Sequence, residues 1–71
     1  MRVIQLIDFN GEYAGLYVTN RTDNNVEKDI VKTFDEVNEQ NVNDVHSEVD
    51  ERLTEIGIRR VFAEEVQTAV I

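Results

Sequence analysis

Residues 22–57 read TDNNVEKDIVKTFDEVNEQNVNDVHSEVDERLTEIG, and this stretch decides the fold because it combines a helical hydrophobic repeat with the whole net negative charge. It holds eleven acidic and three basic residues, a net charge of −8, which equals the net charge of the full 71-residue chain. The four acidic and four basic residues outside it cancel. We therefore expect an acidic helical segment over residues 24–57, covered on its apolar side by a sheet.

Two apolar stripes with steps of three and four residues predict the helical part. The first stripe consists of Val26, Ile30, Val31, Phe34 and Val37, and the second of Val45, Val49, Leu53 and Ile56. Between the stripes, Asn38, Asn41 and Asn43 weaken helix propensity and offer new caps. We favour two helices with a break there over the alternative of one bent helix.

Four positions predict where the helical segment begins and ends. Asn24 followed by Glu27 has the spacing of a capping box, which would start the first helix. Gly57 is suited to the left-handed conformation that ends a helix, and Ile58 to the apolar contact that accompanies such an end.

Residues 1–19 predict a β-hairpin, because Asn10-Gly11 is the dipeptide that most favours a two-residue type I′ turn. The first strand covers about residues 2–9 and is apolar on both faces, which is typical of a central strand. We therefore predict the strand order 2-1-3. An apolar second face also makes Ile7 and Phe9 candidates for an oligomer interface.

The C-terminal segment, residues 59–71, fits a strand or a helix, and we favour a strand because its apolar positions alternate and include β-formers. The resulting architecture is β-β-α-α-β. It is a small two-layer α+β domain over residues 1–71, with a three-stranded antiparallel or mixed sheet covered on one face by helices.

Composition argues against an enzyme, and we expect no catalytic residues, cofactor or metal. The chain has no Cys and one His, so thiolate chemistry and a multi-histidine zinc site are excluded. His46 and Ser47 are neighbours and would point in different directions on a helix, which disfavours a nucleophile and base pair. His46 and Asp50 are one helical turn apart and could bring a nitrogen and an oxygen ligand to a metal. The simpler interpretation is a contact between two side chains on the surface of a helix.

Charge and hydropathy also limit the partners. A net charge of −8 disfavours direct binding to nucleic acid or to an anionic membrane, and it favours a protein with a basic surface, such as a nucleic-acid-binding protein. No apolar run approaches the roughly 20 residues of a membrane span, and the N-terminal apolar run is too short for a signal peptide. We expect a soluble cytoplasmic protein.

Two surfaces are the candidate binding sites. The first is an acidic face made by carboxylates that lie off the apolar stripes: Asp35, Glu36, Glu39, Asp44, Glu48, Glu51 and Glu55. The second is the face of the second strand that carries Tyr13 and Tyr17, near Arg21, because Tyr and Arg are common in binding hot spots. For both surfaces the simpler alternatives stay open: a face that provides solubility, and ordinary packing.

These observations lead to two hypotheses about function. The first is a small acidic protein-binding module that occludes or adapts a basic surface. Compact inhibitors encoded by phages and other mobile elements, including nucleic-acid mimics and anti-defence proteins of the anti-CRISPR type, fit this size and charge. The second is a homo-oligomeric structural protein, such as a homodimer, that associates through its two-sided sheet and uses its acidic residues only for solubility.

Overall fold

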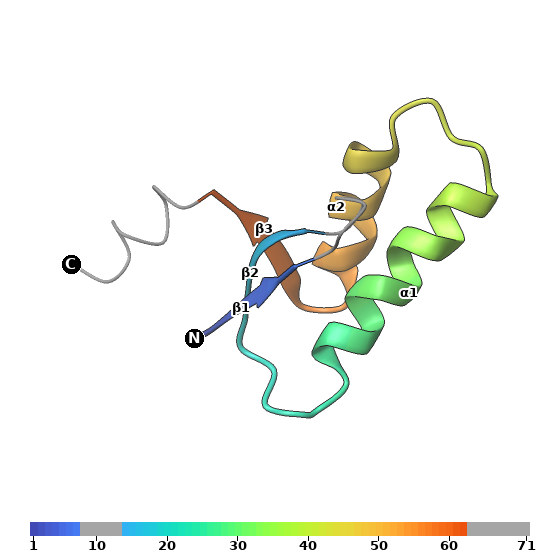
Figure 1. Ribbon diagram of the computed structural model, residues 1–71. Coiled ribbons are helices and arrows are strands. Elements are labelled where there is room, and N and C mark those ends of the chain that lie inside the picture. The colour runs from blue at the N-terminus through green and yellow to red at the C-terminus, as the bar shows by residue number, and fades with distance from the viewer. Residues whose placement is uncertain (8–13, 63–71) are drawn as a thin grey trace.

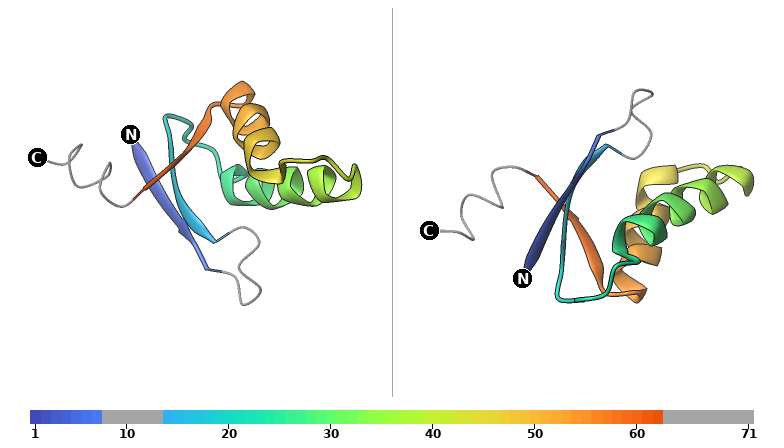
Figure 2. Two further views of the ribbon diagram at one scale, coloured as in Figure 1. Left: turned by 90° about the horizontal axis from the view of Figure 1, so that it is seen from above. Right: turned by 60° about the horizontal axis from the view of Figure 1, so that its bottom comes forward.

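The structure is a computed structural model that describes residues 1–7 and 14–62 of the chain. Its elements are β1 (Arg2–Leu6), β2 (Gly15–Thr19), α1 (Val26–Glu39), α2 (Val45–Glu55) and β3 (Ile58–Val61) (Figure 1). The strands form one antiparallel sheet, and both helices lie on the same side of it (Figure 2). The predicted α+β domain with the order β-β-α-α-β is confirmed.

The predicted strand order is wrong, because β2 and not β1 is the central strand of the sheet. Tyr17 pairs with Ile4 on one side and with Arg60 on the other. At the end of β2, the Thr19 hydroxyl donates a hydrogen bond of 2.6 Å to the carbonyl oxygen of Gly57. This contact lies next to the ladder between β2 and β3, in which Thr19 is opposite Ile58.

The core lies between the sheet and the two helices, and it contains most of the predicted stripes. Burying each of its large side chains contributes about 1.5–3 kcal/mol before conformational entropy is subtracted. Val31 and Val45 are half-buried, and Ile56 at the end of α2 is 39% exposed. The cluster consists of Ile4, Tyr17, Val26, Ile30, Phe34, Val37, Val49, Leu53 and Ile58.

The start of α1 differs from the predicted capping box of Asn24 and Glu27. Asn25 is the N-cap residue, and its side chain makes no capping hydrogen bond. Instead, the carboxylate of Asp23 accepts a hydrogen bond of 3.1 Å from the Asn25 N–H. This two-residue contact is the local turn that Asp side chains favour, and here it precedes the helix.

The predicted break between two helices and the predicted end at Gly57 are confirmed. The helices are separate, and Asn41 follows α1 with φ of 57°, a left-handed conformation that Asn adopts more readily than most residues. Asp44 caps α2. Gly57 follows the last cap with φ of 82°, and Ile58 is buried in the core.

Strand β3 ends at Val61, and the predicted turn at Asn10-Gly11 and the rest of the segment 59–71 lie largely outside the described residues. Among the residues that are described, no helix is both long enough and apolar enough to cross a membrane.

Candidate functional site

The acidic face occupies the exposed sides of both helices. Asp35 and Glu39 lie one turn apart on α1, and Glu51 and Glu55 lie one turn apart on α2. All four are exposed, whereas the residues that face the sheet from the same helices are buried. The helical layer therefore presents carboxylates on both helices.

Asp44 has a structural role at the start of α2. Its carboxylate accepts hydrogen bonds from the Ser47 N–H at 3.1 Å and from the Ser47 hydroxyl at 2.9 Å. The Ser47 N–H bond is the main reason that the pKa of Asp44 lies below its ordinary value. Asp44 is thus engaged within the fold, and so is Ser47, the residue that a nucleophilic mechanism would need.

Two more acidic residues of this face have cationic partners. Glu48 lies 3.0 Å from the Nε of Arg52, which also donates a hydrogen bond to the side chain of Gln40 beyond the end of α1. Glu36 lies 3.9 Å from the Nζ of Lys32. Both pairs span one helical turn, and pairs of this kind contribute about 0.3–0.5 kcal/mol.

Four acidic residues of the predicted face remain available to a partner. Within residues 1–7 and 14–62, no ion pair or hydrogen bond engages the carboxylates of Asp35, Glu39, Glu51 and Glu55. The structure therefore divides the seven predicted residues into three that are engaged within the fold and four that face solvent.

The C-terminal end of α1 is electrostatically unfavourable. The carbonyl groups at the end of a helix carry partial negative charge, so cations stabilise this end and anions destabilise it. The last turn of α1 contains no basic residue, and Glu39 is its last residue. Arg52 reaches Gln40 just past this end, but it is already paired with Glu48.

An open groove of about 520 Å³ lies beside this acidic surface, on the side of α1 that faces Leu6 of β1. Its surface is mainly apolar, with Leu6 and Val31 as the apolar side chains among the described residues that line it. The charged residues along it, all from α1, are Glu27, Lys28, Lys32, Asp35, Glu36 and Glu39.

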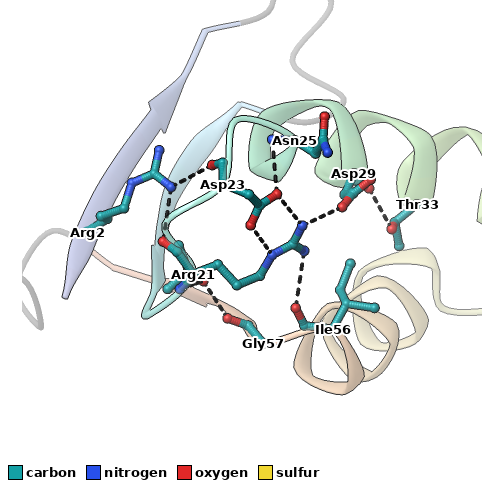
Figure 3. A network of polar contacts seen from close by, with 9 residues as sticks. Arg2, Arg21, Asp23, Asn25, Asp29, Thr33, Ile56 and Gly57 are labelled. Carbon is teal, nitrogen blue, oxygen red and sulfur yellow. Dashed lines mark hydrogen bonds and ion pairs between the residues drawn. The ribbon is translucent and has the colours of Figure 1, made fainter.

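Arg21 lies at the centre of a polar network that joins three segments (Figure 3). Its guanidinium donates two hydrogen bonds to Asp23, at 2.9 and 2.8 Å, and one of 2.9 Å to Asp29 in the first turn of α1. It also donates one of 3.2 Å to the carbonyl oxygen of Ile56 after α2. The bonds from Arg21 lower the pKa of Asp23 to about 2.

The predicted aromatic surface is not formed as expected. Tyr17 is fully buried, because β2 is the central strand and this side of it faces the helices. Burial raises the pKa of Tyr17 to about 12. Tyr13 lies outside the described residues. Tyr17 is therefore a core residue, and Arg21 acts as a connection between elements.

His46 and Asp50 converge on Arg60 of β3. The Arg60 guanidinium lies 2.8 Å from the Nδ1 of His46 and 2.8 Å from a carboxylate oxygen of Asp50. Because a guanidinium only donates, the Nδ1 of His46 is the acceptor in this contact. The Arg60 guanidinium therefore contacts both His46 and Asp50, the two side chains that a metal at this place would need as ligands. The described residues contain no cluster of three or more possible metal ligands.

The two candidates for an oligomer interface have different outcomes. Ile7 follows β1 and is 82% exposed, and Val3 of the same strand is 46% exposed. Phe9 lies outside the described residues. The roles of Arg21 and Arg60 in joining elements of the fold were not predicted from the sequence. A signal was available for Arg21, because Asp23 lies two positions away, but none was available for Arg60, whose partner Asp50 lies ten positions away.

No family model, curated protein or solved structure matches the chain with significant similarity.

Proposed function

We propose that this protein is a small acidic protein-binding module that occludes or adapts a basic surface on another macromolecule. The proposed partner is a protein with a basic surface, such as a nucleic-acid-binding protein, whose cationic groups would meet the exposed carboxylates of α1 and α2. This is the mode of action of an anti-defence inhibitor or a nucleic-acid mimic. The support comes from Asp35, Glu39, Glu51 and Glu55, which are exposed and unengaged within the described residues.

The main observation behind this proposal is the acidic C-terminal end of α1. An anion in the last turn of a helix costs about 0.3–1 kcal/mol, and the stability margin of a domain this small is thin. Glu39 stands in that turn, which contains no basic residue, and Arg52 of α2, which reaches Gln40 beside this end, is paired with Glu48. Residues that oppose the stability of their own element are characteristic of functional surfaces, where a partner supplies the missing interaction.

The net charge of −8 supports the same function through association kinetics. A surface of one sign steers an oppositely charged partner during diffusional encounter, and this steering weakens as salt shortens the screening length. Binding through the acidic face should therefore be fast at low ionic strength and sensitive to salt.

The test is affinity capture of a basic partner by matched charge variants. Glu39→Gln with Glu51→Gln removes one carboxylate from each helix, and we expect affinity for the captured partner to fall on the order of ten-fold. The control is Gln5→Lys with Thr22→Lys, which changes the net charge equally at exposed positions away from the acidic face.

The salt dependence and the control decide the outcome. We expect the partner captured by the wild-type protein to be basic and to be released as salt rises to about 0.5 M, where the screening length is near 4 Å. Equal losses in both variants would mean that net charge alone matters, and the acidic face would then have no specific role. Capture of no basic protein would contradict the proposal.

A second candidate function is homo-oligomeric assembly through the sheet. The observation in its favour is the exposure of Ile7 and Val3, two apolar residues at the edge strand β1. Exposed edge strands with apolar side chains are sites where chains associate. In this case the acidic face would serve only to keep the assembly soluble.

A further inference from the structure

We propose that the groove along α1 binds an amphipathic helix of a partner protein that carries arginines spaced by helical turns, with one apolar residue among them. This inference rests on the proposed function and specifies which part of the acidic surface is the contact site. It commits to a basic protein segment as the occupant, because the groove combines an apolar surface with an excess of carboxylates: four against two ammonium groups.

The order of residues along the groove sets the pattern of the occupant. Glu27, Val31, Asp35 and Glu39 follow one another at four-residue steps, so they form a row along α1 with one residue per turn. The row spans about 18 Å. It contains three carboxylates and one apolar side chain, and it contains no cation.

The two lysines of the groove stand in the neighbouring row. Lys28, Lys32 and Glu36 are also spaced by four residues, and Lys32 lies 3.9 Å from Glu36. One of the four carboxylates therefore has a cation of the same helix close by. The row of Glu27, Val31, Asp35 and Glu39 contains no cation, so its three carboxylates can pair with cations of a partner.

Arginine is the cation that fits this row best. Its planar guanidinium can bind a carboxylate through two parallel hydrogen bonds, and its aliphatic stem can lie on apolar surface. Val31 and Leu6 provide that surface, and both are half-buried. A guanidinium at Glu39 would also place positive charge at the C-terminal end of α1, where the helix lacks it.

The probe is a synthetic alanine-rich helical peptide with arginine, leucine, arginine and arginine at four-residue intervals. A second peptide has alanine in place of the leucine and keeps the same charge and helicity. We expect the wild-type protein to bind the leucine peptide about ten-fold more tightly, because the leucine covers Val31 and Leu6. Isothermal titration calorimetry at low salt measures both affinities.

Three variants locate the site. Asp35→Asn with Glu39→Gln should weaken both peptides roughly ten-fold, whereas Glu51→Gln with Glu55→Gln makes the same charge change on α2 and should weaken them about two-fold. Val31→Ala raises helix propensity and keeps all charges, so it should leave the fold intact and remove the preference for leucine. Circular dichroism confirms folding.

The outcomes separate this inference from the proposed function. Equal losses in the α1 and α2 variants, with no preference for leucine, would overturn the groove as the site and leave charge attraction intact. Failure of the wild-type protein to bind either peptide would also overturn the groove. The proposed function itself depends on the capture of a basic protein, which requires no particular register on α1.

Discussion

Arg21 is one cation in a chain with a net charge of −8, and its side chain connects several elements of the fold. Through its side chain it contacts the loop before α1, the first turn of α1 and the carbonyl after α2. Arg2 of β1 adds hydrogen bonds to the carbonyl oxygens of Arg21 and Asp23, at 3.0 and 2.9 Å. The network thus connects β1, both helices and the loop between β2 and α1 at one corner of the molecule.

This network predicts a loss of stability in acid. The pKa of Asp23 is lowered from 3.8 to about 2 in the folded state, mainly by the hydrogen bonds from Arg21. A lowered pKa contributes stability that is present above pH 3.8 and is lost as the pH falls through about 2. Urea unfolding should show this loss, and Asp23→Asn should make the pH dependence less steep.

The control for this prediction is Asp35→Asn, because Asp35 is exposed and makes no ion pair within the described residues. It should leave the acid dependence as steep as in the wild-type protein. An unchanged slope in Asp23→Asn would show that the bonds between Arg21 and Asp23 do not stabilise the fold in solution.

At the scale of an element, a carboxylate has opposite effects on stability at the two ends of α1. Glu27 lies in the first turn, where a carboxylate is favourable, and Glu39 lies in the last turn, where it is not. The same substitution should therefore have opposite effects. We expect Glu39→Gln to raise the free energy of unfolding by about 0.3–1 kcal/mol at low ionic strength, and Glu27→Gln to lower it by a similar amount.

Denaturant unfolding at low salt measures both effects. A stabilised Glu39→Gln variant with weaker partner binding would show that stability is given up for binding at this position. If both substitutions lowered stability equally, the helix dipole would not be the reason, and the main support for the proposed function would be lost.

The elements could be predicted from the sequence because their signals are local. The stripes in α1 and α2, the break near Asn41 and the end at Gly57 all depend on neighbouring residues. The strand order could not be predicted in this way. It depends on contacts between distant residues, such as the hydrogen bond between Thr19 and Gly57, 38 positions apart, and the apolar second face of β1 pointed to the wrong central strand.

The sequence predicts which residues make up the candidate site, but it does not predict which contacts those residues make. The sequence places seven carboxylates off the apolar stripes, but their ion pairs depend on where Arg52, Lys32 and Ser47 lie. Tyr17 was misplaced because its face of β2 packs against the helices, which the spacing of residues along the strand does not reveal. The spacing of residues along a strand shows which side chains share a face of the sheet. The packing of the other elements decides which face is covered.

At the scale of the whole molecule, the two candidate functions predict opposite responses to salt. Two copies of a chain with a net charge of −8 repel each other, so screening should strengthen any association through apolar surface. Binding to a basic partner should instead weaken. The helical layer carries the exposed carboxylates, and Ile7 lies after β1, so the two kinds of contact use different parts of the surface.

Sedimentation velocity can therefore test the assembly function directly. If it holds, the sedimentation coefficient should rise between about 50 mM and about 500 mM NaCl as screening removes the repulsion between copies. Ile7→Asp should keep the chain monomeric at both concentrations, because a carboxylate at an interface with apolar residues would be desolvated. Thr22→Asp is the matched control, with the same charge change in the exposed loop before α1. A wild-type protein that stays monomeric at both salt concentrations contradicts assembly through the sheet.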